Sequence, residues 1–127
     1  MSSSSSWSAN IERLTLLNKN WRKVIFTGPQ LQVVLMSVPP GESLGWEVHK
    51  ESDQFFRIES GRGVLETRRG KDVKRHQLND GSVAVVPVRV WHNITNKSSS
   101  RLLQIYTIYA PPHHPPNTVH KTREDEI

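Results

Sequence analysis

The chain has 127 residues, no cysteine and a formal net charge of +5 at pH 7. This length suits a single domain built around one core. Because cysteine is absent, disulfide bonds, thiolate ligands and a cysteine nucleophile are excluded, which fits a reducing compartment. Residues 1–7 lack the basic start and apolar run of a secretory signal, and no apolar stretch approaches the length of a membrane span. We therefore expect a cytoplasmic protein with no membrane partner.

The serine repeats of residues 1–8 predict a disordered tail, because serine side chains bury no apolar surface. Trp7 is the one large apolar residue in this tail, and it could dock on the body of the protein. Residues 9–18 fit either a short helical turn or an irregular lead-in, and the sequence leaves both open.

The central part of the chain alternates short apolar segments with turn residues. Strands are expected over residues 23–27, 30–38, 44–49, 54–59, 64–69, 73–78, 83–86, 91–95 and 102–109. Many short strands with little helix are typical of an all-β sandwich or a closed barrel. We accordingly divide the chain into a tail (1–8), a single barrel (9–110) and a proline-rich C-terminal extension (111–127).

The prolines of this extension predict an extended path at its start, and its charged end is expected to fray. His113 and His114 are expected on the surface by composition. The alternative is that the extension, which also holds His120, folds over the barrel mouth and adds a ligand or a substrate contact.

Basic residues gather in the segment that is expected to form a hairpin. They are Arg62, Arg68, Arg69, Lys71, Lys74 and Arg75. A nucleic-acid site would use such a run, but no aromatic residue is interleaved with it. A charged hairpin also protects a sheet edge and keeps it soluble. We therefore expect a solvated hairpin and no nucleic-acid partner.

Two separated stretches hold the candidate site residues. In the first, Glu47 and His49 lie two residues apart, so on a strand both side chains would point to the same face. A carboxylate oxygen and an imidazole nitrogen are both metal ligands. The second stretch supplies another histidine, His92. Taken singly, each of these residues is more often structural than a ligand.

These stretches resemble the two motifs of the cupin superfamily. The first motif runs Gly, five residues, His-x-His, three or four residues, Glu, six residues, Gly; the second runs Gly, five residues, Pro-x-Gly, two residues, His, three residues, Asn. Here the same spacings are occupied by Gly41, Glu47, His49, Gln54 and Gly61, then by Gly81, Pro87, Arg89, His92 and Asn96. The resemblance implies a small metal-binding cupin, with a jelly-roll β-barrel and little helix.

Three positions depart from the motifs. Glu47 stands where the superfamily usually has its first histidine, Gln54 where it has glutamate, and Arg89 where it has glycine. The first two keep donor atoms at the ligand positions. The third affects the turn before His92, since a glycine often marks a backbone conformation that other residues resist.

The resemblance implies that Glu47, His49, Gln54 and His92 converge on a divalent metal ion. Two imidazoles and a carboxylate are typical of non-haem iron(II) sites, while zinc, manganese and nickel also suit this set. Calcium is disfavoured by the two nitrogens. Asn96 is expected to cap the end of its strand.

Candidate catalytic groups are Tyr106 and Arg89. Tyr106 and Tyr109 fall on opposite faces of the last expected strand, and the sequence does not decide which faces the cavity. Arg89 precedes His92 and could hold an anionic substrate, whereas the strand parity of Arg57 places it outside the barrel.

The resemblance implies three functions that stay open: a metal-dependent enzyme acting on or binding a small polar molecule, such as a sugar or oxyacid isomerase or lyase; a non-haem iron dioxygenase; or a non-catalytic ligand-binding module. Trp46, Val48 and Phe55 are expected on the outer face, where an apolar patch predicts a homodimer. The alternative is that residues 9–27 cover this patch within one chain.

Overall fold

The computed structural model describes residues 3–126. Its elements are α1 (Ile11–Leu17), β1 (Arg22–Thr27), β2 (Gln32–Val38), β3 (Asp53–Ser60), β4 (Gly63–Arg69), β5 (Asp72–Leu78), β6 (Val83–Val86), β7 (Trp91–Asn96), β8 (Leu103–Ala110), β9 (Val119–His120) and the 3-10 helix η1 (Arg123–Glu126). The expected all-β class is confirmed. Within the described residues, the helices are too short to traverse a lipid bilayer.

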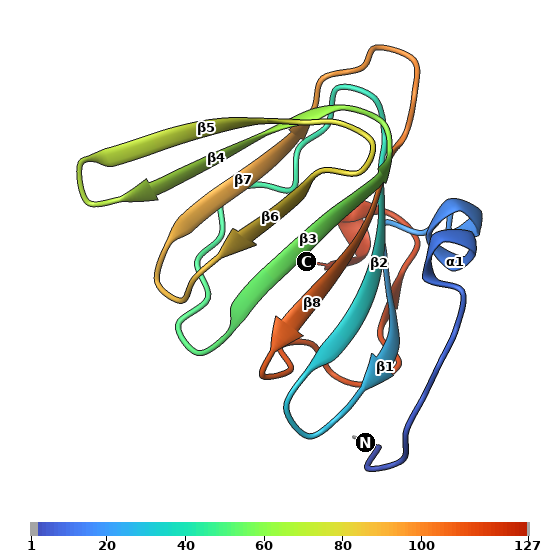
Figure 1. Cartoon of the computed structure of the whole chain (residues 1–127). Coiled ribbons are helices and arrows are strands. Elements are labelled where there is room, and N and C mark those ends of the chain that lie inside the picture. The colour runs from blue at the N-terminus through green and yellow to red at the C-terminus, as the bar shows by residue number, and fades with distance from the viewer. Residues whose placement is uncertain (1–2, 127) are drawn as a thin grey trace.

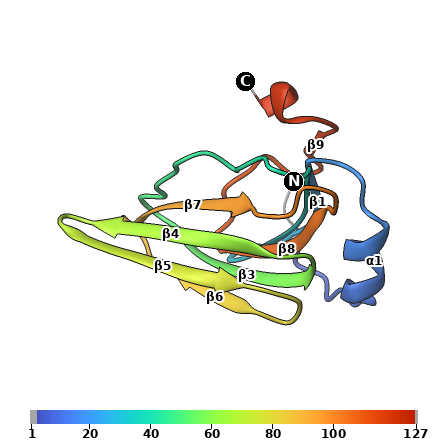
Figure 2. The same ribbon diagram turned by 90° about the horizontal axis from the view of Figure 1, so that it is seen from above.

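The strands form two antiparallel sheets that face each other as layers (Figures 1 and 2). The larger sheet has the order β6-β3-β8-β2-β1-β9, and the smaller one has the order β5-β4-β7. Alternate residues of each strand point inward. Phe56 and Ile58 of β3, Ile105 of β8 and Ile94 of β7 are each at most 1% exposed, and they form the core between the layers.

The segment before β1 is a helix, which settles the alternative left open for residues 9–18. The Asn10 side chain accepts a hydrogen bond from the backbone N–H of Arg13 (3.0 Å) and so caps α1. The carbonyl of Leu16 accepts a hydrogen bond from the Gln104 side chain (2.9 Å). Gln104 faces away from the core on β8, so α1 lies over the outer face of the larger sheet.

The expected strand over residues 44–49 is not a regular strand. This segment contacts the edge of β7 through two isolated bridges, Ser43 to Thr95 and Glu47 to His92. Gly45 between them has a φ of +88°, a left-handed conformation that interrupts the pleat. The remaining expected strands are present, with ends shifted by at most two residues.

Segments near both ends of the chain contact the body. The Trp7 ring docks there, as the sequence allowed, and stacks on Phe26 of β1 (5.4 Å between centroids, 26° between planes); residues 1–2 lie outside the described part. At the other end, β9 pairs with β1. The extension therefore continues the larger sheet instead of trailing from it.

Buried Gln32 at the start of β2 holds the extension in place. Its amide nitrogen donates to the Thr27 hydroxyl (3.0 Å) and to the His114 carbonyl (2.7 Å). Its carbonyl oxygen accepts from the backbone N–H groups of His113 (3.2 Å) and His114 (2.9 Å). Ser52 adds a hydrogen bond to the Pro111 carbonyl (2.7 Å). Residues 111–114 are thus tied to the loops at one end of the two layers.

The expected outer apolar residues divide between the two sheets. Trp46 is 44% exposed and lies beside β7, whereas Phe55 is half-buried on β3 and contacts Tyr106 (6.1 Å between ring centroids). Together they do not form one continuous sheet face. The homodimer stays a prediction.

Asn96 fastens the end of β7. Its amide nitrogen donates to the carbonyls of Val38 and Arg101 (2.9 Å each), and its oxygen accepts from the backbone N–H of Ser98 (2.9 Å). The side chain is 1% exposed. This supports the capping role expected for Asn96.

Replacing Asn96 by Ala is expected to lower the free energy of unfolding by roughly 2–4 kcal/mol, since buried carbonyls and an N–H would lose their partners. Urea unfolding measures the loss. Asn79→Ala is the control: Asn79 is exposed in a turn, and its replacement should change stability by no more than about 0.5 kcal/mol. Equal effects of the two substitutions would contradict the role of Asn96.

Candidate metal centre

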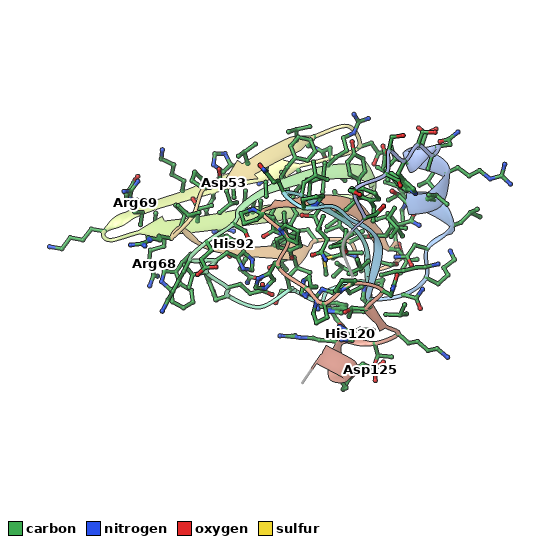
Figure 3. The ribbon with its side chains drawn as sticks, turned by 90° about the horizontal axis from the view of Figure 1, so that it is seen from below. Asp53, Arg68, Arg69, His92, His120 and Asp125 are labelled. Carbon is green, nitrogen blue, oxygen red and sulfur yellow. The ribbon has the colours of Figure 1, made fainter. Side chains whose placement is uncertain are left out.

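Glu47, His49 and His92 converge between the two sheets. Each offers one donor atom, and these atoms all lie within 4.8 Å of one another. The carboxylate Oε2 of Glu47 is 3.5 Å from Nε2 of His49. Figure 3 shows His92 within the body of the protein, far from Arg69 at the tip of the β4–β5 hairpin.

The backbone explains why these side chains meet. The N–H of Glu47 donates to the carbonyl of His92, and the N–H of His92 donates to the carbonyl of Glu47 (2.9 Å each). Residues paired in this way have neighbouring side chains on one face of the sheet. His49 follows two residues later and is buried, while Trp46 between the two bridges stays exposed.

Gln54 lies on β3 with its side chain beside His49. Its amide nitrogen donates to the Thr107 hydroxyl (3.0 Å), which in turn donates its only hydrogen to the Phe55 carbonyl (2.8 Å). The hydroxyl can therefore only accept from Gln54, which fixes the orientation of the amide. Among residues 3–126, Oε1 of Gln54 and the ring nitrogens of buried His49 make no hydrogen bond of good geometry, and the Glu47 carboxylate at 3.5 Å is the charged group beside Nε2 of His49.

Buried polar atoms without such hydrogen bonds are rare, and each costs roughly 1–3 kcal/mol. Their presence at ligand positions fits a site that is completed by a metal ion. Two imidazole nitrogens, a carboxylate oxygen and an amide oxygen suit iron, zinc, manganese or nickel.

The electrostatics of the centre keep its imidazoles neutral. The pKa of His49 is lowered from 6.5 to about 4, first by burial and then by His113 and His92, while the Gln54 side chain opposes the shift. Burial likewise lowers the pKa of His92, opposed by the Val90 carbonyl. A neutral imidazole has the free lone pair that a metal requires.

The C-terminal extension forms a wall of the centre, as in the alternative considered for His113 and His114. The rings of His49 and His113 are 4.3 Å apart between centroids, and His113 stacks on Tyr109 (5.2 Å, 29°). Nε2 of His114 is 3.3 Å from the Tyr109 hydroxyl. His113 is exposed, as expected, and His114 is half-buried. The contact with His49 could not be predicted from composition, because Gln32, which holds the extension, is 81 residues away from His113 in the chain.

The structure places Tyr109, not Tyr106, beside the donors. Tyr109 is 1% exposed and lies edge-on to His49 (5.3 Å, 87°). It pairs with Gln54 across β3 and β8, whereas Tyr106 pairs with Arg57 and faces outward onto Phe55. The tyrosine on the donor side of β8 is therefore Tyr109, and Tyr106 lies on the outer face. Alternation along the strand predicts that the two tyrosines lie on opposite faces of β8, but only the register of β8 against β3 decides which of them faces the donors.

Arg89 is linked to the centre through its backbone. Its N–H donates to the His49 carbonyl (2.8 Å), and its φ of +65° is the left-handed conformation expected at a motif glycine. The residue is exposed, and no contact of its guanidinium with the donors is present among the described residues. The position of Arg89 therefore supports a role in holding the His49 backbone more directly than a role in binding substrate.

The basic hairpin extends away from the centre. Lys74 lies 3.9 Å from Asp72, and Arg75 lies 3.9 Å from Glu66. These pairs are mostly exposed and contribute little to stability. They agree with the solvated hairpin expected from the sequence.

Comparison with known proteins agrees with this geometry. The family model described as a cupin domain matches residues 34–109. The chain belongs to the cupin domain family. The crystal structure of BH2720 from Bacillus halodurans superposes on this cupin with a TM-score of 0.92 and 38% sequence identity, covering 97% of this chain and 94% of that one. The resemblance drawn from the two motifs is thereby confirmed.

Two curated relatives are similar over most of the chain. This cupin is 45% identical over 120 residues to YrkC of Bacillus subtilis (strain 168), covering 93% of this chain and 64% of YrkC. It is 43% identical over 110 residues to L612 of Acanthamoeba polyphaga mimivirus, covering 87% of this chain and 68% of L612. The chain thus spans about two thirds of the length of both relatives.

Replacing Arg89 by Gly is expected to stabilise the protein by about 0.5–1 kcal/mol. Glycine removes a left-handed strain of about 1–2 kcal/mol, and part of the gain is offset by its greater freedom in the unfolded chain. Arg89→Ala is the matched control, because it removes the same side chain and keeps the strain. Urea unfolding compares the two; a glycine variant no more stable than the alanine variant would contradict the strain.

Without metal, the protein is expected to lose stability as the pH falls from about 6.5 toward 4. In this range the unfolded chain binds a proton at His49, whose pKa is about 4 only in the folded state, so protonation favours unfolding. Thermal melting of chelator-treated protein at several pH values measures this loss. His49→Gln, which cannot titrate there, should show a shallower decline, and identical pH profiles would refute the assignment.

Proposed function

We propose that this cupin is a metal-dependent protein that binds a small polar molecule at a centre formed by Glu47, His49, Gln54 and His92. The observation that carries this proposal is the convergence of Glu47, His49 and His92, with donor atoms within 4.8 Å of one another. The oxygen of Gln54, which makes no hydrogen bond of good geometry among the described residues, supports it as a fourth donor. A divalent ion held there would supply Lewis-acid chemistry to a bound carbonyl, carboxylate or hydroxyl group.

The residues around the donors have distinct roles in this proposal. Glu47 contributes the one negative charge among the four donors, and the neutral rings of His49 and His92 contribute nitrogen lone pairs. Tyr109 and His113 contact the His49 ring and would orient a ligand by hydrogen bonding. His113 is exposed, which supports entry of the ligand from solvent on this side.

Our preferred reaction class is isomerisation or elimination on a sugar or an oxyacid. Four protein donors leave two positions of a six-coordinate ion for neighbouring oxygens of such a molecule. Tyr109 and the histidines of the extension supply groups that can hold or pass on a proton. The second candidate is an iron dioxygenase, because Glu47, His49 and His92 are two histidines and one carboxylate, the set typical of non-haem iron(II) oxygenases.

Metal titration of the chelator-treated protein tests the proposal. We expect one Co²⁺, Zn²⁺, Mn²⁺, Ni²⁺ or Fe²⁺ ion per chain, with His49→Ala and His92→Ala each weakening the affinity at least about a hundredfold, since changes to groups that only orient ligands already cost 10–100-fold. His76→Ala is the control, because His76 is exposed on β5 and outside the donor group. Unchanged metal binding in both ligand variants would end the proposal.

The metal-loaded protein then separates the two reaction classes. Oxygen consumption on a substrate panel with iron loaded would favour the dioxygenase, and conversion of sugars or keto acids without oxygen would favour the isomerase or lyase. Metal binding with neither activity would leave a ligand-binding cupin.

A further inference from the structure

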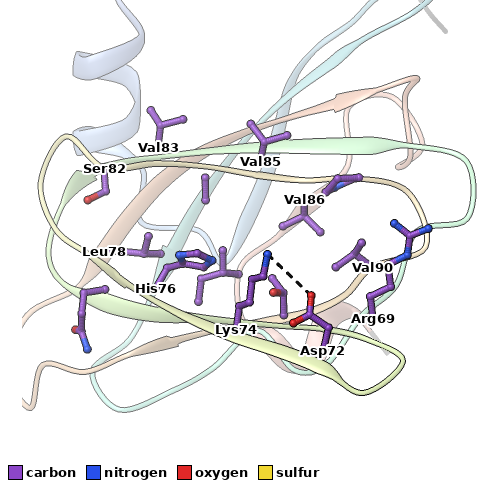
Figure 4. Close-up of a pocket in the computed structure, with 15 residues that line it drawn as sticks. Arg69, Asp72, Lys74, His76, Leu78, Ser82, Val83, Val85, Val86 and Val90 are labelled. Atoms are coloured by element: carbon purple, nitrogen blue, oxygen red, sulfur yellow. Dashed lines mark ion pairs between the residues drawn. The ribbon is translucent and has the colours of Figure 1, made fainter.

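The side of the barrel between β5 and β6 is not closed by hydrogen bonds. Within residues 3–126, β5 pairs with β4 alone and β6 pairs with β3 alone, so each strand has one free edge. A cavity of about 590 Å³ lies between these edges (Figure 4). Its volume is typical of small-molecule sites, which measure roughly 300–1,000 Å³.

This cavity is separate from the candidate metal centre. Glu47, His49 and His92 are not among the residues that line it. The two sites are nevertheless neighbours, because Thr67 of the cavity pairs with His92 across β4 and β7. A ligand in the cavity would therefore lie beside the centre without needing a metal to hold it.

Part of the cavity lining is apolar and belongs to the core. Leu65, Leu78 and Val86 line it and are each at most 3% exposed, and half-buried Ala84 and Val90 add to this surface. This apolar part of the lining can hold the apolar part of a ligand, while the polar side chains of the lining can bind a charged group.

The rim of the cavity is basic. Arg69, Lys74 and His76 line it, against the single carboxylate of Asp72. Lys74 and His76 lie two residues apart on β5, so they share the face that borders the cavity. The pair between Lys74 and Asp72 spans 3.9 Å and is well exposed on both sides, so solvent screens it and Lys74 can exchange Asp72 for a ligand.

We propose that this cavity binds a small carboxylic acid with an apolar body, such as a medium-chain fatty acid, independently of the metal centre. The carboxylate accepts hydrogen bonds from Lys74 and Arg69. The hydrocarbon body packs against half-buried Ala84 and Val90, above the buried Leu65, Leu78 and Val86. Charge and shape thus select an amphipathic anion over a neutral or a cationic molecule of the same length.

Calorimetric titration of the whole protein with octanoate tests the site. We expect saturable binding of one octanoate per chain, with Lys74→Gln weakening the affinity about tenfold, as loss of one charged hydrogen bond implies. Arg75→Gln is the matched control: it removes the same charge from the next residue of β5, which faces away from the cavity toward Glu66. It should change the affinity less than about twofold. Octylamine should not bind.

A second variant tests the apolar part of the cavity. Ala84→Phe places a ring in the space for the hydrocarbon and should abolish binding, with circular dichroism and melting used to verify the fold. Lys74 is exposed, so Lys74→Gln should fold normally. If Ala84→Phe fails to fold, the Lys74→Gln variant still tests the proposal. The proposal would be overturned if octanoate does not bind, or if Lys74→Gln and Arg75→Gln weaken binding equally. It would also be overturned if the protein sediments as a dimer in which the β5 and β6 edges are buried.

The same titration separates this site from the metal centre. Chelator-treated protein and the His92→Ala variant should bind octanoate as tightly as the untreated protein does. If either loses binding, octanoate is a ligand of the metal centre and the separate cavity site is refuted. If metal binding fails in every assay while octanoate still binds, the proposed function fails and the cavity site stands.

Discussion

The candidate centre depends on one backbone contact, the antiparallel bridge between Glu47 and His92. The segment around Glu47 is otherwise irregular, with Gly45 in a left-handed conformation. Two backbone hydrogen bonds of 2.9 Å fix the register at the point where it matters. A slip of one residue would turn the Glu47 side chain to the outer face. The carboxylate and both imidazoles therefore meet because of a short pairing at the edge of β7.

The centre is arranged for binding more than for stability. Burial lowers the pKa of His49 to about 4 and leaves both of its ring nitrogens without a hydrogen bond of good geometry among the described residues. Packing holds the rings in place instead: Phe56 contacts His92 (5.9 Å, 64°), and Tyr109 contacts His49 (5.3 Å, 87°). A preorganised set of desolvated donors is typical of functional sites, where stability is exchanged for activity.

Local patterns predicted most of the fold, since turn residues and apolar alternation locate the strands. The spacing of the two cupin motifs also predicted Glu47, His49 and His92 as one group, because residues at these motif positions come together in the folded cupin domain. The orientation of Gln54 was out of reach, since it depends on Thr107, which is 53 residues later in the chain. The same holds for Tyr109, whose place depends on the register between β3 and β8. Long-range pairing and polar contacts of this kind leave no local trace.

The structure explains why one glycine position of the cupin motifs requires glycine and another accepts a larger residue. Gly61 has a φ of +109°, and a Cβ there would lie 2.7 Å from the Leu102 carbonyl. Arg89 occupies another motif glycine position and keeps its left-handed φ. The two positions differ in the space available for a side chain. Gly61 packs against the start of β8, whereas Arg89 is exposed, so its side chain has room in solvent and its only cost is the strain of the left-handed backbone. Substitution is therefore tolerated at the second position and blocked at the first.

The other two departures from the cupin motifs compensate each other. Glu47 adds a carboxylate where the motif has histidine, and Gln54 removes one where the motif has glutamate, so the four donors keep one formal negative charge. The position of Thr107 explains why the amide belongs on β3. Its hydroxyl donates to Phe55 and can only accept from the residue at position 54, and a carboxylate there would face oxygen lone pairs without a proton between them. The exchange of acid and amide thus preserves both the charge of the centre and the hydrogen bonding around it.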